Sequence, residues 1–124
     1  MNDKPVGLVV IDKRYATVGV WQNDKIEALK HFSSVVSGGG FGKGTRLPPV
    51  RKYYERVGSS ASKAFCDLGI DDVIVGGPSP TKEEFVAGSF LDSRLKIVRM
   101  VDVTYTDESG LYELVEMVKS LIDR

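Results

Sequence analysis

The sequence predicts an α/β fold: a single domain with a five-stranded mixed sheet and flanking helices. Three strand-like segments joined by short polar turns come first, and helical and strand-like segments alternate after them. A length of 124 residues supports one hydrophobic core and not two. Hydrophobic content of 42% and charged content of 27% are ordinary for a globular chain, which excludes disordered, collagen-like and coiled-coil proteins.

Three strands are expected at the start of the chain. Residues 6–11 form a nearly continuous apolar run, which is typical of a strand buried on both faces. Residues 16–21 are rich in threonine and valine, and residues 25–32 alternate between apolar and charged side chains, as in a partly exposed strand. The turns between them are Asp12-Lys13-Arg14 and Gln22-Asn23-Asp24. Turns this short predict an antiparallel meander.

Helices and strands alternate from residue 48 onward. Pro48-Pro49 opens a helix whose apolar side chains recur every three or four residues as far as Leu68, and Gly69 is a suitable C-cap. The remaining elements are a strand at 73–75, a helix capped by Ser79 or Thr81 with apolar positions Phe85, Val86 and Phe90, a strand at 95–103, and a terminal helix capped by Asp107 or Ser109. The order β-β-β-α-β-α-β-α is that of the ribonuclease H-like folds.

Residues 33–49 fit neither a helix nor a strand. Five of the eight residues at 37–44 are glycine, which loses backbone entropy on ordering, so we expect a flexible glycine-rich loop. The net charge is zero, yet residues 43–56 carry five basic residues and one acidic residue. A glycine tip on a basic stem suits RNA, because phosphates attract cations and glycine permits close approach. The predicted RNA-binding residues are Gly38, Gly39, Gly40, Phe41, Gly42, Lys43, Gly44, Arg46, Arg51, Lys52 and Arg56.

Other residues define alternative hypotheses. Asp12 and Asp102, with Asp71 or Asp72 as a third acid, suggest a Mg²⁺-dependent RNA-processing nuclease. Residues 38–44 differ from a nucleotide-binding P-loop, because a glycine stands where the Mg²⁺-binding hydroxyl belongs. One cysteine and one histidine cannot build a metal cluster of those residues, and no cofactor is expected. A protein-interaction domain, with the glycine segment as a linker, is a further alternative.

The compartment is also predicted from composition. No run of about 18 apolar residues is present, and the N-terminus lacks the apolar stretch of a signal peptide. A single cysteine cannot form an internal disulfide. These features predict a cytoplasmic protein.

Several segments together carry a resemblance to a known family, and the last two are fairly specific in combination. They are Val6–Asp12, Ala16–Gly19, Ile26–Ser34, Arg56–Gly58 with Ala61–Phe65, Val75–Lys82, Phe90–Leu95 and Val101–Thr106. Through these segments the chain resembles the middle domain of the archaeal and eukaryotic class-1 peptide chain release factors and, more distantly, Pelota. The resemblance implies that residues 1–124 are one such module of translation termination or ribosome rescue.

In that family a Gly-Gly-Gln tip positions water for hydrolysis of the ester in peptidyl-tRNA on the ribosome. The resemblance therefore implies the ribosome and peptidyl-tRNA as partners, with other release-factor domains or a translational GTPase as further ones, and neither membrane nor DNA. Here Gly38-Gly39-Gly40-Phe41 stands where the tip belongs, and the only glutamine is Gln22, so no catalytic residue is carried over.

The missing glutamine leaves three explanations open. The chain is a naturally inactive relative, its catalytic loop is trimmed or replaced, or a divergent loop still promotes hydrolysis. Our expectation is a module that contacts RNA without hydrolysing peptidyl-tRNA.

Overall fold

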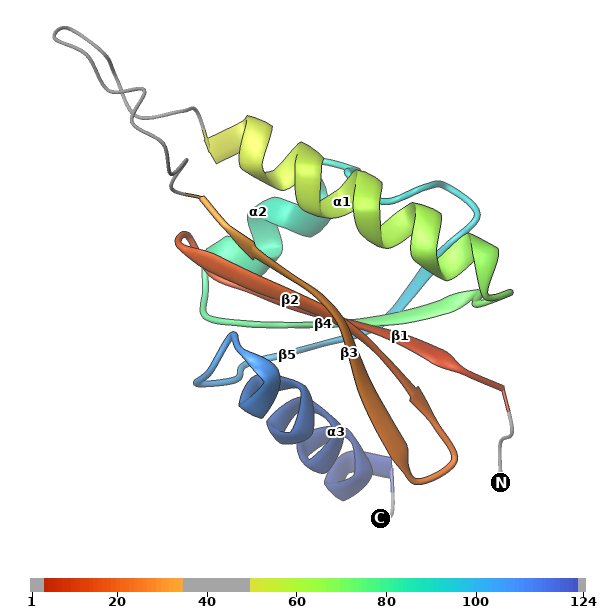
Figure 1. Cartoon of the computed structure of the whole chain (residues 1–124). Coiled ribbons are helices and arrows are strands. Elements are labelled where there is room, and N and C mark those ends of the chain that lie inside the picture. Colours follow the sequence, from red (N-terminus) through yellow and green to blue (C-terminus); the bar gives the residue numbers. More distant parts are fainter. Residues whose placement is uncertain (1–3, 35–49, 123–124) are drawn as a thin grey trace, which may run out of the picture.

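The computed structural model describes residues 4–34 and 50–122, which form a five-stranded mixed sheet between helices (Figure 1). The strands are β1 (Val6–Ile11), β2 (Tyr15–Gln22), β3 (Lys25–Ser33), β4 (Asp72–Gly76) and β5 (Lys96–Val101), and the helices are α1 (Val50–Asp67), α2 (Thr81–Ala87) and α3 (Glu108–Ile122). The sheet order is β3-β2-β1-β4-β5, with β3, β2 and β1 antiparallel and β1, β4 and β5 parallel. The predicted fold class and element order are confirmed.

Strand β1 lies at the centre of the sheet, and both of its faces are covered. Val9 and Ile11 belong to the hydrophobic cluster under α1 and α2, whereas Leu8 and Val10 belong to the cluster under α3. All four side chains are completely buried. The continuous apolar run is therefore a strand between two helical layers, as predicted.

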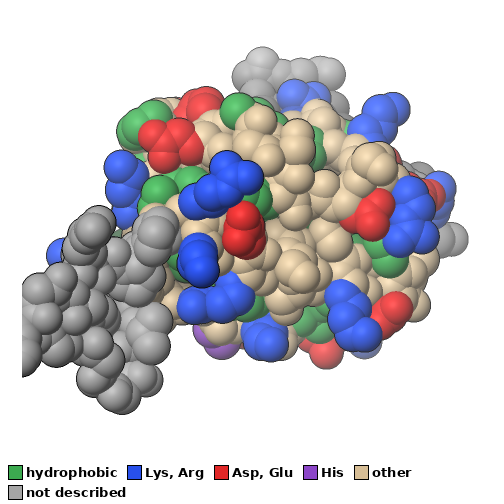
Figure 2. All heavy atoms as spheres, turned by 90° about the horizontal axis from the view of Figure 1, so that it is seen from above, with side chains coloured by type: hydrophobic (Ala, Val, Ile, Leu, Met, Phe, Trp, Pro, Cys, Tyr) green, Lys and Arg blue, Asp and Glu red, His purple; other side chains and the backbone are tan. Residues whose placement is uncertain are grey.

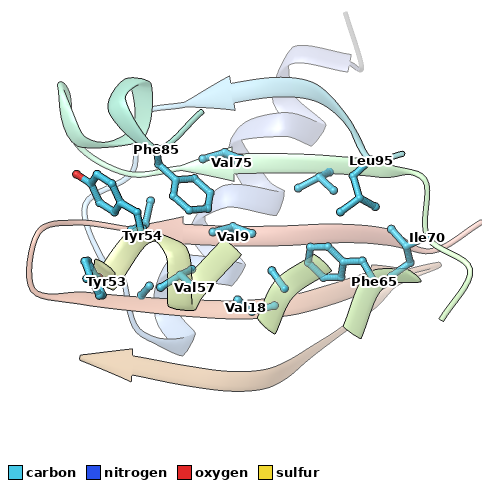
Figure 3. Close-up of a cluster of buried hydrophobic side chains, with 14 residues drawn as sticks. Val9, Val18, Tyr53, Tyr54, Val57, Phe65, Ile70, Val75, Phe85 and Leu95 are labelled. Atoms are coloured by element: carbon cyan, nitrogen blue, oxygen red, sulfur yellow. The ribbon is translucent and has the colours of Figure 1, made fainter. Parts of the chain in front are cut away.

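The cluster on the α1 face is built around aromatic rings (Figure 3). Tyr54 meets Phe85 edge-on at 5.8 Å between ring centroids, and Phe90 stacks on Phe85 at the same distance. Phe65 is completely buried in the same cluster. These contacts join α1 to α2 and to the segment that follows it.

Two glycines end elements as their backbone angles require. Gly69 has a φ of +72° directly after α1, which confirms the predicted C-cap. Gly77 has a φ of +149°, and a Cβ there would lie 2.1 Å from the carbonyl oxygen of Ile11. The turn that carries the chain from β4 into α2 therefore has room only for glycine.

Three boundary predictions are corrected. Pro80 occupies the N-cap position of α2 without a side-chain hydrogen bond, so neither Thr81 nor Ser79 caps it. Phe90 lies beyond the end of α2 at Ala87, and β5 is shorter than the predicted strand at 95–103. Within residues 4–34 and 50–122, no helix is long and apolar enough to cross a membrane.

A hydrogen-bond network joins β2, β3 and the segment between β5 and α3. Buried Thr17 donates its hydroxyl proton to the carbonyl of Thr106 at 2.8 Å, and its Oγ1 lies 3.0 Å from Nδ1 of His31. Because a hydroxyl has one proton, Thr17 must accept the second hydrogen bond from His31. The ring of His31 therefore carries a proton on Nδ1.

The contact of Gly58 with the segment after α2 leads to a first prediction. A Cβ at position 58 would lie 2.3 Å from the carbonyl oxygen of Phe90. Gly58→Ala gains about 1 kcal/mol of helix propensity but loses about 1–3 kcal/mol to the clash, so we expect a net destabilisation of about 1 kcal/mol. Urea unfolding measures it. Ser59→Ala, at an exposed neighbouring position, should be neutral or stabilising; a higher midpoint for Gly58→Ala would contradict the close approach.

The tautomer of His31 is the second prediction. Long-range ¹H–¹⁵N spectra at alkaline pH should show the proton on Nδ1. Thr17→Val should abolish this preference and cost about 1–2 kcal/mol of unfolding free energy, because a buried carbonyl loses its donor. Thr104→Val, an exposed threonine with the same change of shape, serves as the control. A ring protonated on Nε2 alone would exclude the network.

Candidate nucleic-acid interface

Three of the predicted RNA-binding residues lie in the described part of the chain. Arg51, Lys52 and Arg56 are exposed and occupy the first two turns of α1. The others lie outside the described residues: Gly38, Gly39, Gly40, Phe41, Gly42, Lys43, Gly44 and Arg46. The predicted interface can therefore be built only from the helix that follows them and from the elements that this helix touches.

The three cations share a helix face because the opposite face is buried. Tyr53, Tyr54 and Val57 pack into the core, which turns the basic side chains toward solvent. The first turn of α1 contains no acidic residue. The N-terminus of a helix is the positive end of its dipole, so cations there destabilise the helix by a few tenths of a kcal/mol. A bound anion would offset this repulsion.

The charges on this face are only partly neutralised. Arg51 forms an exposed ion pair with Glu55, Nε to Oε2 at 3.2 Å, and exposed pairs contribute little. Arg56 donates from Nη2 to the carbonyl of Ser33 at 2.5 Å, which satisfies a hydrogen bond but supplies no negative charge. Lys52 has no ion pair with any described residue. Net positive charge therefore remains on the exposed face of α1.

Two further cations, which the sequence analysis assigned only to a turn, lie beside this face. The backbone N–H of Ser34 donates to the carbonyl of Arg14 at 2.8 Å, so the β1–β2 turn with Lys13 and Arg14 adjoins the end of β3. Figure 2 shows Lys and Arg side chains gathered beside the grey atoms, with the single histidine at the border. The antiparallel meander was the signal that could have placed them, because it brings the first turn back to the end of its third strand.

The tyrosines beneath the basic face anchor α1. Tyr53 donates to the carbonyl of Asp12 at 2.9 Å, and Tyr54 donates to Oε1 of Glu84 at 3.0 Å. Burial and then the charge of Asp12 raise the pKa of Tyr53 far above its ordinary value. Burial, followed by the hydrogen bond to Glu84, raises the pKa of Tyr54 to about 12. Both phenols are therefore neutral hydrogen-bond donors near pH 7.

The carboxylates of the nuclease hypothesis have structural partners. Oδ1 of Asp12 accepts the backbone N–H groups of Arg14 and Tyr15, both at 2.7 Å, and its Oδ2 accepts the hydroxyl of Thr106 at 3.0 Å. Asp71 forms an exposed ion pair with Lys4. Among residues 4–34 and 50–122, no three His, Cys, Asp or Glu side chains are grouped to hold a metal ion.

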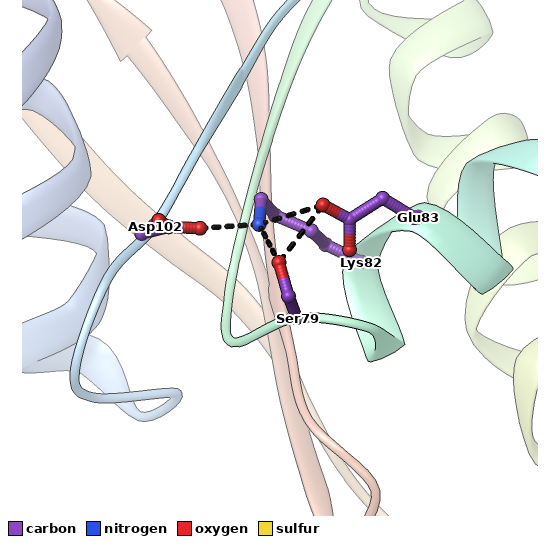
Figure 4. Close-up of polar contacts among 4 residues, drawn as sticks. All are labelled: Ser79, Lys82, Glu83 and Asp102. Carbon is purple, nitrogen blue, oxygen red and sulfur yellow. Dashed lines mark hydrogen bonds and ion pairs between the residues drawn. The ribbon is translucent and has the colours of Figure 1, made fainter.

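Asp102, the second acid of that hypothesis, belongs to a cluster with a buried lysine (Figure 4). Lys82 is only 4% exposed, and its amine donates to Asp102, to Ser79 at 2.8 Å and to Glu83 at 3.1 Å. Burial alone would lower the pKa of Lys82, but the hydrogen bonds to Asp102 and Glu83 outweigh it and raise that pKa. The three N–H groups are satisfied, so the cluster joins α2 to the end of β5.

Comparisons with known proteins agree with this fold. The sequence model of the family described as eRF1 domain 2 matches residues 5–124. Peptide chain release factor subunit 1 of Methanococcoides burtonii is 41% identical over 133 aligned residues, which cover 97% of this chain and 32% of the relative. The chain thus spans about a third of the length of the curated relatives that it matches.

Solved structures show the same architecture. The crystal structure of an archaeal translation termination factor, aRF1, matches with a TM-score of 0.76 and 28% identity, over 95% of this chain and 35% of that one. A ribosome-bound archaeal Pelota matches in fold, with a TM-score of 0.64 and 23% identity over 90% of this chain and 31% of the other. The family match over residues 5–124 and the identity to release factors agree: the chain belongs to the eRF1 domain 2 family.

Proposed function

We propose that this chain is a translation module, acting in termination or ribosome rescue, that contacts ribosomal and transfer RNA through residues 38–56 without hydrolysing peptidyl-tRNA. The observation that carries the proposal is the uncompensated positive charge of Lys52 and Arg56 on α1. These cations follow the glycine-rich segment directly, in a chain 41% identical to an archaeal release factor. The proposed contacts of that segment are Gly38, Gly39, Gly40, Phe41, Gly42, Lys43, Gly44 and Arg46.

The attraction to RNA is local. The chain as a whole has no net charge, so long-range steering by its total charge is absent. At physiological ionic strength the screening length is about 8 Å, and only cations close to a phosphate act on it. A compact group of cations at one end of a neutral body therefore sets the orientation in which the module meets RNA.

The absence of hydrolysis rests on the missing amide. Gln22, the only glutamine, ends β2 beside the turn to Lys25, whereas Tyr15 at the start of β2 pairs with Ser33. Gln22 is thus roughly 20 Å along the strand from Tyr15, the residue that pairs with Ser33. The alignment with the release factor of Methanococcoides burtonii has 133 positions, more than the 124 residues of this chain. The relative therefore has residues within the aligned region that have no counterpart in this chain.

The relatives support a set of proposed partners. Curated relatives are about three times as long as this chain, so about two thirds of their length has no counterpart in residues 1–124. Acting as one module in the cytoplasm, the chain would bind the ribosome and peptidyl-tRNA, with other release-factor domains or a translational GTPase as further partners.

The third prediction concerns hydrolysis. Purified protein added to ribosomes that hold peptidyl-tRNA should release peptide no faster than a blank, because no glutamine follows Gly38-Gly39-Gly40 to orient the attacking water. A full-length archaeal release factor is the positive control. Release clearly above the blank would contradict the inactive assignment and favour a divergent loop that still promotes hydrolysis.

The fourth prediction concerns α1. Arg51→Ala/Lys52→Ala should weaken co-sedimentation with archaeal large ribosomal subunits and reduce the slope of log affinity against log salt by about one to two. The matched control is Lys25→Ala/Lys96→Ala, which removes the same charge from exposed positions at the opposite end of the sheet. Equal binding by both variants would favour the protein-interaction alternative over RNA contact.

A further inference from the structure

The β1–β2 turn presents two cations on a rigid support. Lys13 and Arg14 are exposed, and neither forms an ion pair with a described residue. The turn beneath them is closed by the backbone N–H of Asp12, which donates to the carbonyl of Tyr15 at 2.9 Å, and by the two amides that Oδ1 of Asp12 accepts. Because the turn backbone is already fixed, binding would need to order only the two side chains.

The turn and α1 lie on either side of the same chain segment. Ser34, the last described residue before position 50, donates to the carbonyl of Arg14 at 2.8 Å, and its neighbour Ser33 accepts from Arg56 at 2.5 Å. Arg14 and Arg56 are therefore each hydrogen-bonded to one of two consecutive residues. Cations from β1–β2 and cations from α1 flank the point where the glycine-rich segment leaves the sheet.

The acidic side chain in the turn neutralises these cations only in part. Asp12 directs both oxygens toward protein donors, with Oδ1 on two backbone amides and Oδ2 on the hydroxyl of Thr106. The single negative charge of Asp12 offsets one of the two positive charges of Lys13 and Arg14, so one positive charge remains. On α1, Glu55 is likewise engaged with Arg51. Positive charge therefore remains on both sides of Ser33 and Ser34.

We propose that Lys13 and Arg14 form a second phosphate-binding element, so that an RNA backbone is held from the β1–β2 turn as well as from α1. The inference rests on the proposed RNA contact and adds a second, separate group of cations to it. Two groups of cations that bind different phosphates define the line along which the RNA backbone crosses the module. One group alone does not define that line. Exposed cations contact phosphates without reading sequence, so the ligand class is the RNA backbone.

The test is a double variant, Lys13→Ala/Arg14→Ala, in co-sedimentation with archaeal large ribosomal subunits at several salt concentrations. The backbone hydrogen bond from Ser34 to Arg14 does not depend on the side chain. We expect affinity to fall on the order of fivefold, as for two exposed charge pairs, and the salt slope to fall by about two. Unchanged circular dichroism and unfolding midpoint confirm that the fold is retained.

Two controls separate charge from structure. Lys13→Arg/Arg14→Lys keeps both charges and should bind within about twofold of the parent, because phosphates respond chiefly to charge at exposed positions. Lys25→Ala/Lys96→Ala removes two charges elsewhere and should change little. The effects of the Lys13/Arg14 and Arg51/Lys52 variants should add in the quadruple variant, because separate phosphates are involved.

The outcomes distinguish this inference from the proposed function. If Arg51→Ala/Lys52→Ala weakens binding while Lys13→Ala/Arg14→Ala behaves like the Lys25/Lys96 control, the second element is refuted and the RNA contact through α1 stands. If neither variant weakens binding, both proposals fail together. Loss of binding in the charge-retaining variant would refute a phosphate contact and indicate a structural role of the turn.

Discussion

The hydrogen bonds of the Asp12 carboxylate, directly after β1, hold together the end of the sheet where α1 begins. The carboxylate accepts two backbone amides of the β1–β2 turn and the hydroxyl of Thr106, and the carbonyl of the same residue accepts from Tyr53. One residue thereby joins the central strand, the turn, α1 and the segment before α3. Hydrogen bonds to a charged group contribute about 1.5–3 kcal/mol each, enough to fix this junction. Asp102, directly after β5, serves a similar purpose, since it is bonded to buried Lys82.

Such a frame suits recognition at a surface. The core consists of two hydrophobic clusters on opposite faces of one sheet, and the polar side chains at the ends of the strands are bonded to one another. What remains for a partner is the charge on the rigid edge: α1 on one side and the β1–β2 turn on the other. A polyanion that binds there would meet cations whose backbone is already fixed, so only their side chains would need to be ordered.

Sequence reasoning predicted this structure where the pattern was strong and local. The apolar run at 6–11, the stripe of α1 and the glycine after it were all predicted, because burial on two faces, helical spacing and a left-handed backbone each leave a direct mark on residue choice. Contacts between residues far apart in the sequence leave no such mark on residue choice. Lys82 is a buried lysine only because Asp102 lies beside it, and Lys13 and Arg14 join the basic face only through the strand register. The prediction that Ser79 caps α2 was wrong, because its hydroxyl donates to Glu83 and accepts from Lys82 instead.

The attachment of residues 35–49 has a consequence for how such a chain can evolve. That stretch leaves from Ser34, which is bonded to Arg14, and returns to α1, which Tyr53 and Tyr54 anchor to the body. Both anchor points are made by residues outside the stretch, and in a flexible loop each doubling of length costs only about 0.6 kcal/mol of closure entropy. Natural selection can therefore change the length and sequence of this stretch while the scaffold that carries its two ends is inherited unchanged.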